Sequence, residues 1–135
     1  AVLGIEQLKR LDYNIWRRQE NLRVWVSCLD PIRYHVDFKE EGSSNFSLPI
    51  IVHDSDKELF NKICHLLDVD DIEYRIGTAG GGNQARQPYL SKCDYKIAEE
   101  LTNANYVHDF GLYIGNHPEL DTEEVINLCD KLNLL

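Results

Sequence analysis

The chain has 135 residues, of which 43% are hydrophobic and 27% charged, a balance typical of one soluble globular domain with an ordinary core. Its formal net charge of −9 argues against nucleic acid or anionic membranes as the main partner, because phosphate groups attract clustered lysine and arginine. No apolar run approaches the roughly 18 residues that a membrane-spanning helix needs, and the chain shows no signal-peptide pattern.

The four cysteines are spread along the chain about 30 residues apart, without a C-x-x-C pair. This spacing fits neither a zinc site nor the dense framework of a small secreted domain, so we expect reduced thiols in a cytoplasmic protein and no metal site. Cys64 and Cys129 lie in apolar helical patterns, and we expect them to be buried and unreactive.

The first predicted element is one long amphipathic helix over residues 2–29, ended by the Asp30-Pro31 step. Its apolar positions recur at steps of three and four residues: Ile5, Leu8, Leu11, Ile15, Leu22, Val26 and Leu29. Residues 1–30 carry a small positive charge, whereas the rest of the chain is strongly acidic. The helix is longer than a domain of this size needs, so we expect its apolar face to pack on something outside this chain. The absence of methionine also indicates a piece of a longer protein.

The next elements alternate between strands and a helix. Residues 33–38 alternate weakly and could form a short strand or an extended linker. Residues 46–54 read as a buried strand, in which Pro49 suggests an edge position or a bulge. A helix follows, capped by Ser55 or Asp56, and residues 72–77 form a second strand.

The last third of the chain completes the fold. Residues 90–111 are predicted to be helical in their middle, with interruptions at Asn103 and Asn105. Residues 112–115 form a third strand, and a final helix begins at a cap on Asp121 or Thr122. This order predicts an α/β fold of the α+β two-layer sandwich type, in which helices cover a small, mostly antiparallel three-stranded sheet.

The glycine-rich stretch GTAGGGNQARQPYL at residues 77–90 holds four of the chain's eight glycines. A phosphate cradle is disfavoured, because the stretch lacks the Lys-Ser/Thr of a P-loop and does not fit G-x-G-x-x-G. A slack surface loop and a loop that closes over a ligand both remain open. Asn83, Arg86 and Gln87 favour the second, since arginine can bind a carboxylate or phosphate bidentately and amides can contact hydroxyls and carbonyls.

The remaining polar residues do not complete a catalytic set. His108-Asp109 is interpreted as a solvated or core-satisfying pair, because further metal ligands at helical spacing are missing. His117 follows a strand and could be structural or functional. We find no nucleophile signature and name no catalytic residue.

Three segments together resemble the sugar aminotransferases of the DegT/StrS type, which are fold-type I enzymes that use pyridoxal phosphate. AVLGIEQLKRLDYNIWRRQEN resembles the helix after the active-site region. GGGNQARQPYL resembles the substrate-side loop, particularly of the 4-keto-6-deoxyhexose 3-dehydratase branch. NANYVHDFGLYIGNHPELDTEEVINLCDKLN resembles the C-terminal stretch of the family.

The resemblance implies that residues 1–30 connect to a missing large domain and that residues 31–135 form the small C-terminal domain. The large domain would hold pyridoxal phosphate and the aldimine lysine, or a histidine in the 3-dehydratase branch, so this chain alone should be inactive. By position in the motifs, the residues that would line the nucleotide-sugar side of the cleft are Asn83, Arg86 and Gln87, with Tyr113, Asn116 and His117 as neighbours.

The resemblance further implies a homodimeric enzyme of surface glycan or lipopolysaccharide biosynthesis, acting on a nucleotide-linked keto-deoxysugar. Its reaction would be transamination or loss of the C3 hydroxyl. The alternative is a stand-alone, non-catalytic module that binds a small molecule or regulates another protein, and a purely structural interaction domain is the third possibility.

Overall fold

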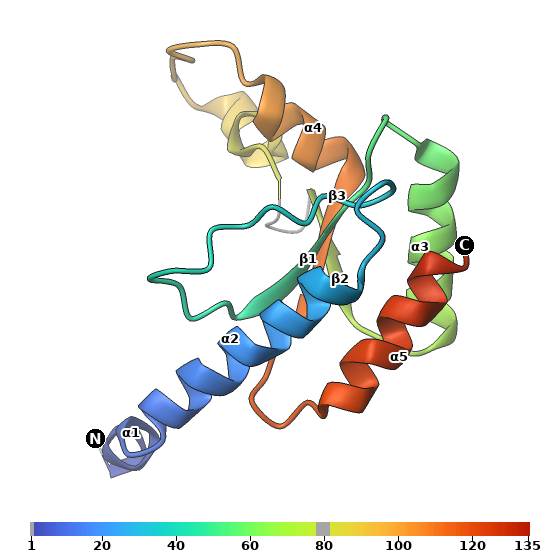
Figure 1. The fold of residues 1–135 in the computed structure, drawn as a ribbon. Coiled ribbons are helices and arrows are strands. Elements are labelled where there is room, and N and C mark those ends of the chain that lie inside the picture. Colours follow the sequence, from blue (N-terminus) through green and yellow to red (C-terminus); the bar gives the residue numbers. More distant parts are fainter. Residues whose placement is uncertain (1, 78–81) are drawn as a thin grey trace. The chain divides into compact units, whose positions relative to one another are not determined.

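Residues 2–77 and 82–135 are described by a computed structural model, in which five α-helices accompany a three-stranded sheet (Figure 1). The helices are α1 (Val2–Leu8), α2 (Leu11–Cys28), α3 (Lys57–Val69), α4 (Thr102–Phe110) and α5 (Thr122–Asn133). The strands are β1 (Ser47–Ile51), β2 (Tyr74–Ile76) and β3 (Gly111–Gly115), and the short 3-10 helices are η2 (Gln84–Arg86) and η3 (Pro88–Lys92). Across these ranges no helix is long and apolar enough to cross a membrane.

The chain divides into two compact units. Unit 1 contains the residues as far as Pro31, together with Val36–Leu48 and Gly115–Leu135. Unit 2 contains Ile32–His35 and Pro49–Ile114.

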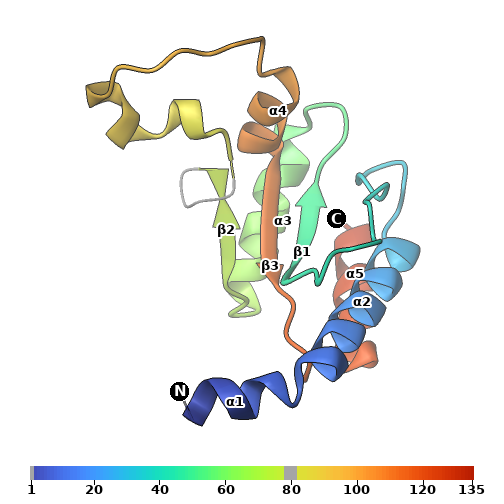
Figure 2. The ribbon, with the colours of Figure 1, turned by 90° about the vertical axis from the view of Figure 1, so that its left-hand side faces the viewer.

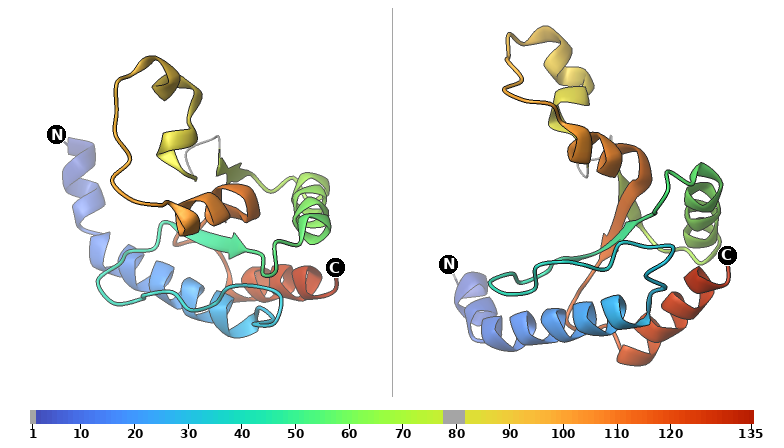
Figure 3. Two further views of the ribbon diagram at one scale, coloured as in Figure 1. Left: turned by 90° about the horizontal axis from the view of Figure 1, so that it is seen from above. Right: turned by 45° about the horizontal axis from the view of Figure 1, so that its top comes forward.

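Unit 1 is built on the packing of α2 against α5, the pair of helices seen side by side in Figure 3. The apolar residues that α2 and α5 bury are Leu22, Trp25, Val125, Cys129 and Leu132. One side chain ties the ends of these helices together, since the Asn133 amide donates to the Cys28 carbonyl at 2.8 Å and its oxygen accepts from the Asp30 N–H at 2.9 Å. Asp121 and Glu124 form a capping box at the start of α5, so the cap falls on the first of the two expected positions.

Unit 2 is built on the sheet, whose strand order is β1-β3-β2 (Figure 2). β2 pairs antiparallel with β3, in a register that places Arg75 opposite Tyr113. β1 is an edge strand, which accommodates the missing N–H of Pro49 as the sequence predicted. α3 lies over one face of the sheet and buries Leu59, Phe60, Ile63 and Leu67, and Asp56 caps it by accepting from the Leu59 N–H at 2.9 Å.

The antiparallel three-stranded sheet and its covering helices confirm the predicted fold class, but two local predictions need correction. The single helix over residues 2–29 is divided at Lys9 and Arg10 into α1 and α2. All residues of α1 are exposed, so no packing against residues 2–77 or 82–135 holds the two helices in one line. This exposure also shows that the apolar pattern of residues 2–8 does not face the core of unit 1.

The other correction concerns α4, and the structure also decides between the strand and the linker for residues 33–38. Residues 33–38 are mostly linker, with one isolated bridge from Tyr34 to Val52. α4 runs through Asn103 and Asn105 without interruption and begins only at Thr102, while residues 93–101 are not helical. Asn105 is tolerated because its side chain accepts a bond from Asn83 and therefore does not compete for its own backbone.

Candidate functional site

The loop that carries Arg86 is fastened to α4 by an ion pair in unit 2. The two terminal nitrogens of Arg86 donate to the two carboxylate oxygens of Asp109, each at 2.8 Å. The side chains of Arg86 and Asp109 are 40% and 45% exposed, so solvent and ligands can reach the pair. The Arg86 guanidinium holds the pKa of the Asp109 carboxyl below its usual value, chiefly through this hydrogen bond.

The two amides beside Arg86 are buried and hydrogen-bonded within the chain. Asn83 donates to the Asn105 side chain at 2.9 Å and accepts from the Ala85 N–H, also at 2.9 Å. Gln87 donates to the Gly77 carbonyl at 2.7 Å. Both side chains are only 6% exposed, so they shape the loop and leave Arg86 as its outward-facing cation.

His108 supports the same loop from α4. Its Nδ1 accepts from the Asn83 N–H at 3.1 Å, which requires the tautomer that carries its proton on Nε2. Gly77 and Gly82 pack against this histidine so closely that a Cβ on either would lie within 2.9 Å of His108 Nδ1. Glycine is therefore needed at both positions. Thr78–Gly81, the rest of the predicted glycine loop, lie outside the described residues.

The other three predicted site residues occupy two different places. Tyr113 lies on β3 in unit 2, opposite Arg75, and is half-buried. Asn116 and His117 follow β3 in unit 1. His117 is exposed, whereas Asn116 is 2% exposed.

Asn116 is the centre of a buried amide cluster with Asn21. Its oxygen accepts from the Asn21 amide at 3.0 Å, and its nitrogen donates to the carbonyls of Arg18 and Asn45 at 2.9 and 2.8 Å. The Asn116 side chain thus holds α2 and the loop ending at Asn45 onto the turn after β3.

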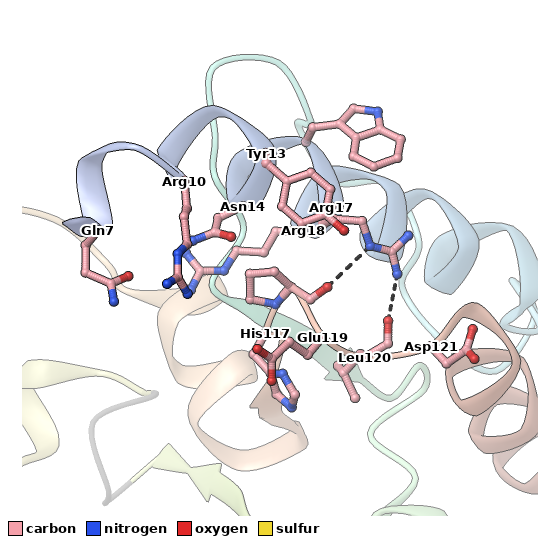
Figure 4. A pocket seen from close by; sticks show the side chains of 12 residues that line it. Gln7, Arg10, Tyr13, Asn14, Arg17, Arg18, His117, Glu119, Leu120 and Asp121 are labelled. Carbon is pink, nitrogen blue, oxygen red and sulfur yellow. Dashed lines mark hydrogen bonds between the residues drawn. The ribbon is translucent and has the colours of Figure 1, made fainter.

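A cleft in unit 1 lies beside that turn and has His117 in its wall (Figure 4). Its volume is about 860 Å³, in the upper part of the range of small-molecule sites. The side chains of Asn14 and Arg18 on α2, and of Arg10 just before it, reach into the cleft. Arg17, also on α2, donates to the carbonyls of Pro118 at 3.3 Å and Leu120 at 2.7 Å, in the segment between β3 and α5.

Sequence reasoning found the loop but missed the residues that hold it. Asn105, His108 and Asp109 present one helical face to the loop, and each bonds either Asn83 or Arg86. Their i, i+3, i+4 spacing was the available signal. The arginines of the cleft were also missed, because their spacing resembles that of an ordinary solvated helix face.

The comparison with protein families decides the membership of this chain. The model of the DegT/DnrJ/EryC1/StrS aminotransferase family matches residues 1–133. The chain belongs to this family.

Two relatives are similar in sequence to this chain over almost its whole length. A GDP-4-keto-6-deoxy-D-mannose 3-dehydratase of Yersinia pseudotuberculosis is 31% identical over 134 residues, covering 98% of this chain and 34% of that protein. The lipopolysaccharide biosynthesis protein RfbH of Salmonella typhimurium is 28% identical over 135 residues, covering 97% of this chain and 30% of that protein. The chain therefore spans about a third of the length of these relatives.

The solved structures agree with the fold. A crystal structure of GDP-4-keto-6-deoxymannose-3-dehydratase with a trapped PLP-glutamate geminal diamine matches with a TM-score of 0.83 and 27% identity. The match covers 96% of this chain and 33% of the dehydratase chain. The resemblance to sugar aminotransferases and 3-dehydratases is thereby confirmed, as is pyridoxal phosphate for the family.

The described residues do not form a binding site for pyridoxal phosphate. The cleft in unit 1 has arginines and amides in its wall but no lysine that could form an aldimine, and its aspartate, Asp121, is engaged at the cap of α5. In the same residues no cluster of three or more His, Cys, Asp or Glu side chains could hold a metal ion. The arginines in the wall of this cleft are suited to binding an anion.

Proposed function

We propose that this chain is the C-terminal part of a pyridoxal-phosphate-dependent enzyme that acts on a nucleotide-linked keto-deoxysugar in surface glycan or lipopolysaccharide biosynthesis. The observation that carries the proposal is the 31% identity to the 3-dehydratase, which extends over 134 residues. A homodimer with a large domain that precedes this segment is part of the proposal. The free thiols favour a cytoplasmic enzyme.

The cofactor, held by the remainder of the protein, supplies an electron sink for bond changes next to the keto carbon. The residues of this chain bind and orient the sugar nucleotide. Arg86 can donate hydrogen bonds to the oxygens of the sugar nucleotide, because its side chain stays exposed and each terminal nitrogen keeps a second N–H beside the one that Asp109 accepts. Tyr113 and His117 are the other proposed contacts.

The buried amides have a supporting role in this proposal. Asn83 and Gln87 hold the loop in the shape that presents Arg86, and Asn116 holds the turn that presents His117. These three amides therefore contribute to the substrate site by positioning Arg86 and His117, since their own amide groups are hydrogen-bonded within the chain.

The decisive experiment uses the protein extended to the length of its relatives, supplied with pyridoxal phosphate, glutamate and GDP-4-keto-6-deoxymannose. Product identity by mass spectrometry separates loss of the C3 hydroxyl from transamination. Arg86→Ala should raise KM roughly 10- to 100-fold, the range of a lost charge-assisted hydrogen-bonded pair. Lys62→Ala, which removes an exposed cation paired with Glu58 on α3, is the matched control and should leave KM unchanged.

If neither product forms and the chain alone binds the sugar nucleotide, the enzyme hypothesis is wrong. The non-catalytic binding module is then the better interpretation. Turnover that is insensitive to Arg86→Ala would leave the activity but remove Arg86 from the substrate site.

A further inference from the structure

Three arginines on the first half of α2 and the residue before it have no acidic partner in the described part of the chain. They are Arg10, Arg17 and Arg18, whereas Arg23, Arg75 and Arg86 each pair with a carboxylate. The chain has 23 acidic residues and 14 basic ones, so an unpaired arginine is unexpected on charge balance. All three arginines line the same cleft of unit 1 (Figure 4).

Two of these guanidinium groups are oriented by backbone carbonyls. Arg17 uses Nε and one terminal nitrogen on the carbonyls of Pro118 and Leu120, and Arg18 uses Nε on the carbonyl of Asn116 at 3.1 Å. The terminal nitrogens of Arg18 keep their donors available. No partner for Arg10 occurs among residues 2–77 and 82–135, so its whole guanidinium is available to a ligand. An anion would meet donors that are already held in place.

The rest of the wall is compatible with a negative ligand. Gln7 and Asn14 add amide donors on the side of Arg10. The carboxylates in the wall belong to Glu119 and Asp121, and that of Asp121 is engaged by the backbone at the start of α5. Three arginines against these two carboxylates leave the cleft positive in a chain whose net charge is −9.

Two aromatic rings stand at the same cleft. Tyr13 and Trp16 are 59% and 51% exposed, and their ring centroids are 5.9 Å apart. Exposed aromatic rings beside arginines can stack on a nucleobase while the guanidinium groups bind phosphate. The cleft's volume of about 860 Å³ admits a ligand of that size.

We propose that this cleft binds a nucleoside diphosphate, with the diphosphate on Arg10 and Arg18 and the base against Tyr13. The identity of the ligand rests on the proposed function, because a nucleotide-linked sugar carries this group. The anion site itself rests only on the arginines and their geometry.

The test titrates the 135-residue chain, labelled with nitrogen-15, with GDP, inorganic pyrophosphate and guanosine. GDP and pyrophosphate should shift the Arg10 and Arg18 Nε–H signals saturably, GDP should also perturb the Tyr13 ring, and guanosine should bind at least 10-fold more weakly than GDP. Arg10→Ala should weaken GDP binding at least about 10-fold, the lower end of the loss expected for a charged hydrogen bond. Arg10→Lys should recover part of that loss, since it keeps the charge without the planar fork.

Lys9→Ala is the matched control, because Lys9 is the adjacent cation but pairs with Glu6 at 2.6 Å and lies outside the cleft. It should change GDP affinity less than 2-fold. An equal loss in both variants would reduce the effect to general charge and overturn the site. The site would also be overturned if millimolar GDP and pyrophosphate gave no saturable shift. It would be overturned too if Arg10→Ala changed only the sedimentation of the chain, because that result would indicate contacts between copies.

These outcomes are distinct from those of the proposed function. Binding of GDP through Arg10 in a protein that turns over no sugar nucleotide would keep the cleft and refute the enzyme. Turnover by the extended protein without GDP binding at Arg10 would do the reverse.

Discussion

Arg86 and Asp109 form a two-bonded ion pair across 23 residues of sequence, with both N–O distances at 2.8 Å. The pair lowers the pKa of the Asp109 carboxyl below 3.8 and raises that of the Arg86 guanidinium. Because a lowered carboxyl pKa stabilises the ionised form, the pair contributes above pH 3.8 and is lost as pH falls through the lowered pKa of Asp109.

Arg86→Ala should therefore raise the pKa of Asp109 toward 3.8, measured by following its carboxyl carbon by NMR against pH. Arg75→Ala removes another exposed, paired arginine of unit 2 and should leave the titration of Asp109 in place. Identical Asp109 titrations in the wild type and Arg86→Ala would mean that the pair does not form in solution.

Removing the buried amide of Asn116 should destabilise the chain by about 2–4 kcal/mol, because it leaves the Asn45 carbonyl and the Asn21 amide short of partners. Urea unfolding measures the change in the free energy of unfolding. Asn61→Ala, on the exposed side of α3, is the control and should stay within about 0.5 kcal/mol of the wild type. A loss for Asn116→Ala no larger than that of the control would contradict the amide cluster.

Gly82→Ala should destabilise unit 2 by about 1–3 kcal/mol, the usual range for overpacking. The new Cβ would lie 2.5 Å from His108 Nδ1 and 2.6 Å from the Gly77 Cα, and the backbone cannot yield as a flexible side chain would. Gly115→Ala has no atom within 4 Å of its Cβ and serves as the matched control. Hydrogen exchange at the Asn83 N–H should become faster in Gly82→Ala alone, and an equal rate in both variants would refute the close packing on His108.

The cysteines should differ sharply in reactivity. Cys129 is fully buried, as the sequence predicted, and burial raises the pKa of its thiol to about 12. Cys93 is exposed, and Cys64 is half-buried with a raised thiol pKa, again chiefly from burial. An alkylating reagent at pH 8, followed by peptide mass spectrometry, should label Cys93 in the native chain and Cys129 only after unfolding. Labelling of both at one rate would place Cys129 outside the core.

The chain should self-associate through α1, whose Val2, Leu3, Ile5 and Leu8 are 58–83% exposed. Leu3→Gln combined with Leu8→Gln should shift the sedimentation equilibrium toward the monomer. Val69→Gln, which replaces an apolar residue 67% exposed at the end of α3, should not. A wild-type chain that stays monomeric at high concentration would refute this interface.

The elements that could be predicted from the sequence are those whose apolar periodicity points to a core. α5 shows this clearly, since Val125, Cys129 and Leu132 recur at steps of four and three and are all buried. The division between α1 and α2 could not be predicted, because the apolar pattern of residues 2–8 is the same whether its partner is inside or outside the chain. The hydrogen bond between the Asn83 and Asn105 side chains could not be predicted from the sequence either, because it depends on two segments 22 residues apart meeting in space.

The make-up of unit 1 has a consequence for biosynthesis. Unit 2 is almost continuous in sequence, so its residues are all available once Ile114 has left the ribosome. Unit 1 needs α5, and the caps that Asn133 places on Cys28 and Asp30 come from one of the last residues of this segment. α2 must therefore wait, with its apolar side uncovered, while more than a hundred further residues are translated. During that interval the side chain of Trp25, which is fully buried in the folded chain, is part of an uncovered apolar surface of the kind that promotes aggregation.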